Sequence, residues 1–174
     1  MPEFTREKIQ RLLEVLNDEL RRMNVRGEIN LAGGAVMCLA FKARDSTRDV
    51  DAEFKPSVQV REAAIRVSER EGVPDSWLND AVKTYLSEYG SFTPYLELSH
   101  LKVFTADARY MLAMKCLAMR VGEGYRDEED IRYLLRNLDL ESYESARKIL
   151  AAYYDLDSYP KQALDALREL LPKS

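Results

Sequence analysis

The sequence predicts an α+β fold in which helices flank a small mixed sheet and a helical portion follows towards the C-terminus. Two observations lead to this prediction. Over residues 1–105, segments with helical periodicity alternate with segments of period two, which is typical of strands. Over residues 106–174, only helical periodicity is found. We therefore expect an α/β core at 1–105 and a helical portion at 106–174 that packs on the core.

The α/β core is predicted from a regular succession of patterns. The first helix has apolar residues at helical spacing and charged residues at its remaining positions. Two strands follow, with alternating polar and apolar residues, and they enclose a short helix that comes after a glycine pair. Two further strands, joined by Ser99-His100, end the core. The predicted helices are 5–23, 35–43, 59–71 and 75–87, and the predicted strands are 28–32, 47–54, 94–98 and 101–105.

The helical portion has four predicted helices, at 106–120, 127–138, 141–154 and 160–171. Around Lys115, over 111–119, the first of these helices is apolar nearly all round. A lysine in such a helix either extends its ammonium group to solvent or neutralises a buried or bound negative charge. Asp127 and Asp130 either stabilise the first turn of the next helix through its dipole or pair with Lys115 or Arg120. The sequence leaves the role of Lys115 open, and it favours a mixed role for Asp127 and a helical role for Asp130.

Composition restricts the class of protein. Hydrophobic residues make up 46% of the chain and charged residues 32%, which excludes collagen-like, mucin-like and disordered classes. The formal net charge of −4 argues against nonspecific nucleic-acid binding through overall charge. The longest apolar run, 31–41, is too short to cross a bilayer, so no membrane association is expected. The two cysteines lie in apolar helical patterns and are expected to be reduced, which favours a cytoplasmic location.

One segment has residues suited to phosphate and metal chemistry. Gly33 and Gly34 lie between a predicted strand and a predicted helix, where the backbone can approach a ligand without an intervening Cβ. Asp49 and Asp51 follow on the next predicted strand, and residues two apart on a strand share a face. Carboxylate oxygens held together are suited to Mg²⁺. Each motif occurs often by chance, so the hypothesis depends on their order along the chain.

Four short stretches occur in a fixed order over residues 31–138. They are LAGGAV at 31–36, STRDVD at 46–51, MLAMKCLAMR at 111–120 and RDEEDI at 126–131. As a set they resemble the nucleotidyltransferase superfamily, and in particular the AbiEii-like branch of abortive-infection and toxin–antitoxin systems. Many superfamily members have a serine at the glycine pair or directly after it, whereas this chain has Gly34 and Ala35 there.

The resemblance implies a polymerase-beta-like core that transfers NMP from an NTP to a hydroxyl acceptor with Mg²⁺ or Mn²⁺. The acceptor would be RNA, such as tRNA, or a protein, and the chain would be a toxin with an antitoxin partner. The residues implied to contact the nucleotide are Gly33, Gly34, Thr47, Arg48, Lys115, Arg120 and Asp127. The residues implied to carry catalysis are Asp49, Asp51, a third carboxylate and Lys115, with the three acids binding the metal.

The third carboxylate implied by the resemblance is expected on a neighbouring strand. Glu97 is the first candidate because it follows the alternation of the strand at 94–98. Glu53 is the second, since it lies two residues after Asp51. The alternative for Glu97 is an acid that faces solvent on an edge strand.

Two other classes of function remain open. One is a catalytically inactive module that binds a nucleotide or a protein partner, favoured by the missing serine and the uncertain third acid. The other is a helical RNA-binding protein that uses Arg132 and Arg136, which lie one helical turn apart. A solvated helix face explains these two arginines better in a net-acidic chain.

Overall fold

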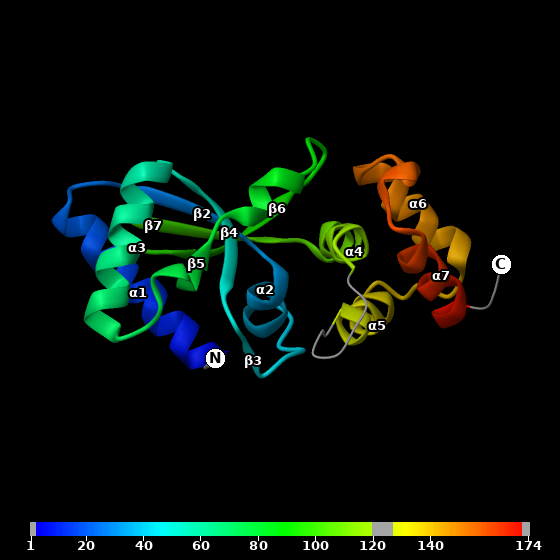
Figure 1. Cartoon of the computed structure of the whole chain (residues 1–174), viewed down its shortest axis with the longest axis horizontal. Helices are drawn as coiled ribbons and strands as arrows, with labels where there is room; N and C mark the ends of the chain where they lie inside the picture. Colours follow the sequence, from blue (N-terminus) through cyan, green and yellow to red (C-terminus); the bar gives the residue numbers. More distant parts are fainter. Residues whose placement is uncertain (1–2, 120–126, 172–174) are drawn as a thin grey trace. The chain divides into compact units, whose positions relative to one another are not determined.

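The computed structural model describes residues 3–119 and 127–171. Contacts within the chain define two compact units, and Figure 1 shows their elements. Unit 1 comprises Met1–Thr84 and Phe92–Ala106, and unit 2 comprises Tyr85–Ser91 and Asp107–Ser174. Unit 1 contains a mixed five-stranded sheet, and the described part of unit 2 is helical. The predicted α+β class is therefore confirmed.

The main sheet of unit 1 has the strand order β5-β4-β2-β7-β6. Its central strand β2 pairs in parallel with β7 and antiparallel with β4, while β4 pairs in parallel with β5 and β7 antiparallel with β6. A second sheet pairs the short strands β1 and β3. The strands are β1 (Phe4–Thr5), β2 (Gly27–Ala32), β3 (Ser46–Thr47), β4 (Val50–Lys55), β5 (Leu78–Asn79), β6 (Phe92–Glu97) and β7 (Leu101–Ala106).

The two faces of the main sheet differ in burial. Helices α1 (Arg6–Arg22) and α3 (Ser57–Glu71) pack against each other and against the sheet, and α2 (Gly33–Leu39) packs beside β4. Alternate strand residues form the buried face, among them Ile29, Leu31, Val50, Ala52, Leu101 and Val103. The residues between them are half-buried or exposed and mostly polar. This polar face is the side of the sheet on which a site can form.

Unit 2 contains α4 (Ala108–Leu117), α5 (Asp127–Asn137), α6 (Tyr143–Tyr153) and α7 (Lys161–Leu170), close to the predicted ranges. Asp107 and Ser142 accept hydrogen bonds from the first turns of α4 and α6, which fixes where these helices begin. The segment Tyr85–Ser91 belongs to this unit because Ser87 N donates to the Tyr110 hydroxyl and Ser87 Oγ to the backbone oxygen of Tyr153.

The predicted helix at 75–87 is wrong. The segment instead forms a 3₁₀ turn at Asp75–Trp77, the short strand β5 and a second 3₁₀ turn at Ala81–Tyr85. Trp77 is buried, and its indole N–H donates to the Ala64 oxygen at 2.9 Å. Leu78 then pairs with Val50 at the edge of the sheet. Tertiary packing of two consecutive apolar residues outweighs the local helical pattern.

Two further findings concern the apolar helices and the cysteines of the described chain. No helix in the described part of the chain is long and apolar enough to cross a membrane. Cys38 and Cys116 are free thiols and both are buried, as the sequence predicts. Burial raises the pKa of the Cys116 thiol to about 12, and the nearby Asp127 carboxylate adds to this effect.

An ion-pair cluster joins α1 to α3 and gives a pH-dependent prediction. The Asp18 carboxylate accepts hydrogen bonds from Arg21 and from Arg70, the second at 2.9 Å. These two guanidinium groups lower the pKa of the Asp18 carboxyl from its usual 3.8 to about 2. A carboxyl whose pKa is lower in the folded state stabilises the protein at pH values above its unfolded-state pKa. This stabilisation is lost as the pH falls through the folded-state pKa. We expect the Asp18→Asn variant to have a lower urea midpoint than wild type at neutral pH. The difference should vanish between about pH 3.8 and about pH 2. A difference that persists unchanged below pH 2 would contradict this assignment.

Candidate functional site

The glycine pair directly follows β2 and forms the first residues of α2, where the chain makes a tight turn. Gly33 has a φ of +63°, in the left-handed region that glycine adopts without strain. A Cβ built on Gly33 would lie 2.5 Å from Asp51 Oδ2. The Asp51 carboxylate can therefore contact the turn only because residue 33 has no side chain. The predicted proximity of the glycine pair and Asp51 is what the structure shows.

Two further polar groups lie over the second glycine of the turn. A Cβ built on Gly34 would overlap Thr47 Oγ1 and would lie 2.5 Å from Arg44 Nη1. The turn is thus bordered by a carboxylate, a hydroxyl and a guanidinium. Carboxylates bind hard metal ions, while hydroxyl and guanidinium groups bind phosphate oxygens. Helix α2 spans only seven residues, so its dipole adds little and these side chains carry the site.

Asp49 and Asp51 do not lie on one continuous strand. The predicted strand at 47–54 is interrupted at Arg48 and Asp49, which form a bend between β3 and β4. Asp51 lies on β4, opposite Ala32 at the end of β2. The Thr47 hydroxyl donates to the Asp49 backbone oxygen at 3.3 Å, which helps to hold the bend. The expected sharing of a strand face therefore does not apply to Asp49.

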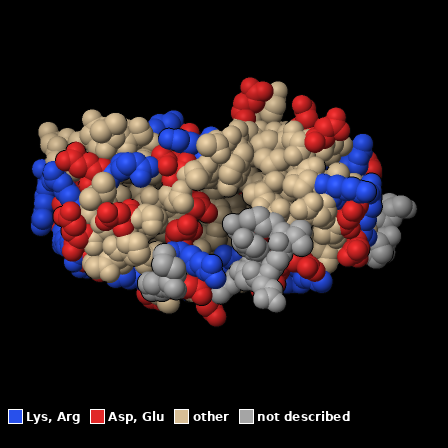
Figure 2. Space-filling view, viewed as in Figure 1, with Lys and Arg blue, Asp and Glu red and all other residues tan. Residues whose placement is uncertain are grey.

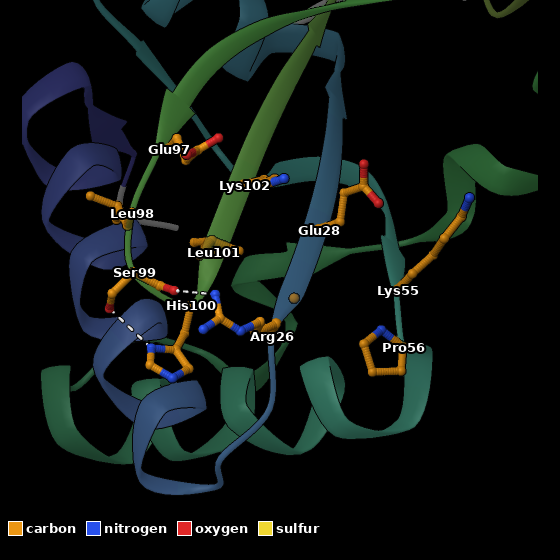
Figure 3. A pocket seen from close by; sticks show the side chains of 11 residues that line it. Arg26, Glu28, Lys55, Pro56, Glu97, Leu98, Ser99, His100, Leu101 and Lys102 are labelled. Atoms are coloured by element: carbon orange, nitrogen blue, oxygen red, sulfur yellow. Dashed lines mark hydrogen bonds between the residues drawn. The ribbon is translucent and has the colours of Figure 1, made fainter.

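Glu97 lies at the other end of the sheet from Asp51, so the first candidate for the third acid is corrected. Glu97 pairs with Lys102, and Lys102 pairs with Glu28 near the start of β2. Asp51 pairs with Ala32, four residues further along β2, which corresponds to about 13 Å. Because β7 runs parallel to β2 and β6 runs antiparallel to β7, the end of β6 lies at the same end of the sheet as the start of β2. Figure 3 shows Glu97 there, near Glu28 and Lys102.

Glu53, the second candidate for the third carboxylate, lies close to Asp51. It lies two residues after Asp51 on β4 and therefore points to the same face. Its carboxylate accepts a hydrogen bond from the Asn30 side chain at 3.2 Å. On β7, the residue paired with Asn30 is Phe104, which supplies no ligand. Among the described residues, no three histidine, cysteine, aspartate or glutamate side chains gather as a metal-binding group.

Unit 2 contains a half-buried lysine with two buried carboxylate partners. Lys115 Nζ lies 2.7 Å from Asp130 Oδ2 and 3.4 Å from Asp127 Oδ1. The three side chains are 13%, 5% and 8% exposed, respectively. Of the alternatives left open for Lys115, neutralisation of buried negative charge is what the structure shows. The sequence reasoning favoured a purely helical role for Asp130, which is in fact the nearer partner.

The remaining candidates are less informative. Arg48 is exposed in the bend before β4, and Arg120 lies outside the described residues. Lys115 and Asp127 belong to unit 2, whereas the glycine turn belongs to unit 1. The sequence reasoning missed Arg44, which no motif singles out. Its place beside Gly34 follows from the path of the chain between α2 and β3.

The alternative of RNA binding through α5 receives little support. Arg132 pairs with Glu128 at 2.9 Å on the same helix, as expected for a solvated helix face. Acidic and basic side chains are interspersed among the described residues on the face shown in Figure 2. Such a surface is unlike the continuous basic surfaces that bind nucleic-acid backbones.

Comparison with known proteins assigns no family. No family model matches the chain, and no curated protein or solved structure matches it significantly. The fold and the site define an α+β protein with a glycine turn bordered by Asp51, Thr47 and Arg44.

Proposed function

We propose that this protein is a nucleotidyltransferase that transfers NMP from an NTP to a hydroxyl acceptor. The observation that carries the proposal is the close approach of the Asp51 carboxylate to the Gly33–Gly34 turn. This contact places a hard oxygen ligand directly beside the backbone at the start of α2, so a metal ion held by Asp51 would lie near phosphates bound there. The reaction itself is taken from the resemblance of the sequence to nucleotidyltransferases.

Each residue at the turn has a proposed role. The two glycines leave room for Asp51, Thr47 and Arg44 to approach the backbone. Arg44 and Thr47 supply donors that neutralise and orient the phosphates. Asp51, with Asp49 next to it in sequence, would hold Mg²⁺ or Mn²⁺. These donors fit, because Mg²⁺ bound with a nucleotide usually takes one or two carboxylates and several phosphate oxygens. When bound, the ion would withdraw charge from the phosphate under attack. A direct contact of Lys115 with the nucleotide stays a prediction.

A second candidate function is nucleotide binding without transfer. The position of Glu97 favours it, because the acid expected to complete the site lies at the far end of the sheet. Glu53 is then the candidate third acid that lies two residues from Asp51, on the same face of the same strand. A protein of this kind would bind an NTP and report its presence to a partner.

The acceptor and the biological partner are proposed from the resemblance alone. AbiEii-like relatives can modify tRNA and act as toxins, so tRNA is the first acceptor to test and a protein the second. An antitoxin partner belongs to the same proposal. The reaction would take place in the cytoplasm, where NTPs and tRNA are found.

The proposal is tested by comparing wild type with Asp51→Asn. We expect calorimetry to detect binding of an NTP with Mg²⁺, and we expect labelled NTP to transfer its nucleotide to tRNA or protein. Asp51→Asn should weaken binding at least about tenfold and abolish detectable transfer, because it removes a charge that holds the ion.

The matched control is Asp45→Asn. Asp45 is exposed on the connection between α2 and β3, so this variant removes the same charge nearby without touching the turn. It should bind and transfer like wild type. If wild type binds the NTP but transfers no nucleotide, the second candidate function is favoured. If both variants lose binding equally, or if wild type does not bind the NTP, the proposed site is wrong.

A further inference from the structure

Four charged side chains form a row across the main sheet, at the end far from the glycine turn. Lys55 pairs with Glu28, Glu28 with Lys102, and Lys102 with Glu97. Paired residues on adjacent strands point to the same face. This charged row therefore alternates lysine and glutamate across β4, β2, β7 and β6, and Figure 3 shows the four side chains in that order.

The charges of the row are not neutralised within the described part of the chain. None of the four side chains has a hydrogen bond or ion pair with another described residue. Lys55, Lys102 and Glu97 are exposed and Glu28 is half-buried. The row borders a cavity of about 490 Å³, whose lining also includes Arg26, Pro56 and His100. The row is thus accessible to a partner and has unused charge.

We propose that a second copy of this chain docks on the charged row through a two-fold axis that runs along the strands between β2 and β7. Rotation about this axis reverses the order of the row. Lys55 then faces Glu97 of the partner subunit, and Glu28 faces Lys102 of the partner subunit. All four charges meet opposite charges, and the symmetry makes each contact twice. A two-fold axis across the strands would instead set lysine against lysine and glutamate against glutamate, so the row selects one orientation.

The neighbouring positions are compatible with the same axis. One row further along the strands, Asn30 and Phe104 are paired residues, so Asn30 faces Phe104 of the partner subunit. Glu53 lies on β4 and faces the β6 strand of the partner, at the level of Pro94. No like charges oppose each other in this second row. Asp51 is about 13 Å from the charged row, so the inference is independent of the proposed function.

The dimer is expected to be weak and sensitive to salt. Exposed ion pairs contribute little individually, and salt screens them. Sedimentation equilibrium of the full chain should show a monomer–dimer equilibrium at about 50 mM NaCl. The dissociation constant should rise at least about tenfold at about 500 mM NaCl.

Charge reversal tests the pairing directly. E28K and K102E should each raise the dissociation constant at least about tenfold, because each sets two like-charged pairs against each other. The double variant E28K/K102E should restore dimerisation, since the opposed charges are complementary again. The matched control is E69K, which reverses an exposed charge on α3 and should dimerise like wild type.

Several results would overturn the inference. They are a wild type that stays monomeric at low salt, a dimer that E28K or K102E leaves intact, and a double variant that stays monomeric although circular dichroism shows it folded. None of these readouts involves a nucleotide, so failure here is distinct from failure of the proposed function.

Discussion

Replacing Lys115 with methionine should lower the free energy of unfolding by about 3–5 kcal/mol, because the variant removes the cation that two buried carboxylates contact. Lys115 Nζ is the cation that links Asp130 and Asp127, at 2.7 Å and 3.4 Å. Methionine has a similar length and fills the same space, so the loss reports the missing charge rather than a cavity. Urea unfolding followed by circular dichroism measures the effect.

A second substitution separates charge from packing at this cluster. If the missing cation is the cause, Asp130→Asn in the Lys115→Met background should recover part of the lost stability. In wild type, Asp130→Asn alone should be destabilising, since Lys115 then keeps only the more distant Asp127. Non-additivity of this kind is expected for residues in one ion-pair network. A loss below about 1 kcal/mol for Lys115→Met would show that solvent solvates the acids well enough without the lysine.

The elements that could be predicted from the sequence are those whose burial follows their local period. Helices α1 and α3 have one apolar stripe each, and the structure begins and ends them within two residues of the predicted bounds. The strand at 28–32 was predicted for the same reason. Trp77 and Leu78 were not, because a pair of adjacent apolar residues fits a helix or a short edge strand equally well. Packing against Ala64 and Val50 decides between them.

The same distinction applies to the site. Gly33 directly follows β2, and Asp51 lies on β4, which pairs with β2 and is close to it in sequence, so their order was sufficient to predict their contact. The position of Glu97 depends on the parallel pairing of β7 with β2, which joins residues more than seventy positions apart. No local pattern encodes that register. Without it, neither the position of Glu97 at the far end of the sheet from Asp51 nor the charged row could be predicted.

Gly33→Ala should cost about 2–4 kcal/mol of stability and abolish NTP binding. Two separate effects contribute. An alanine at a φ of +63° adopts a strained backbone, and its Cβ would lie 2.5 Å from Asp51 Oδ2. The strain can be relieved only by moving the turn or the Asp51 carboxylate. Either movement separates the metal ligand from the backbone that is proposed to receive the phosphates.

Gly72→Ala isolates the backbone effect, because Gly72 has nearly the same φ of +67° and no atom within 4 Å of a built Cβ. This variant should lose about 1 kcal/mol and bind NTP like wild type. The difference between the two variants in urea midpoint then measures the cost of displacing Asp51, and calorimetry shows whether that displacement removes the ligand site. Equal stability losses in the two variants, with NTP binding retained in both, would mean that Asp51 moves aside freely. The close contact at Gly33 would then have no part in binding.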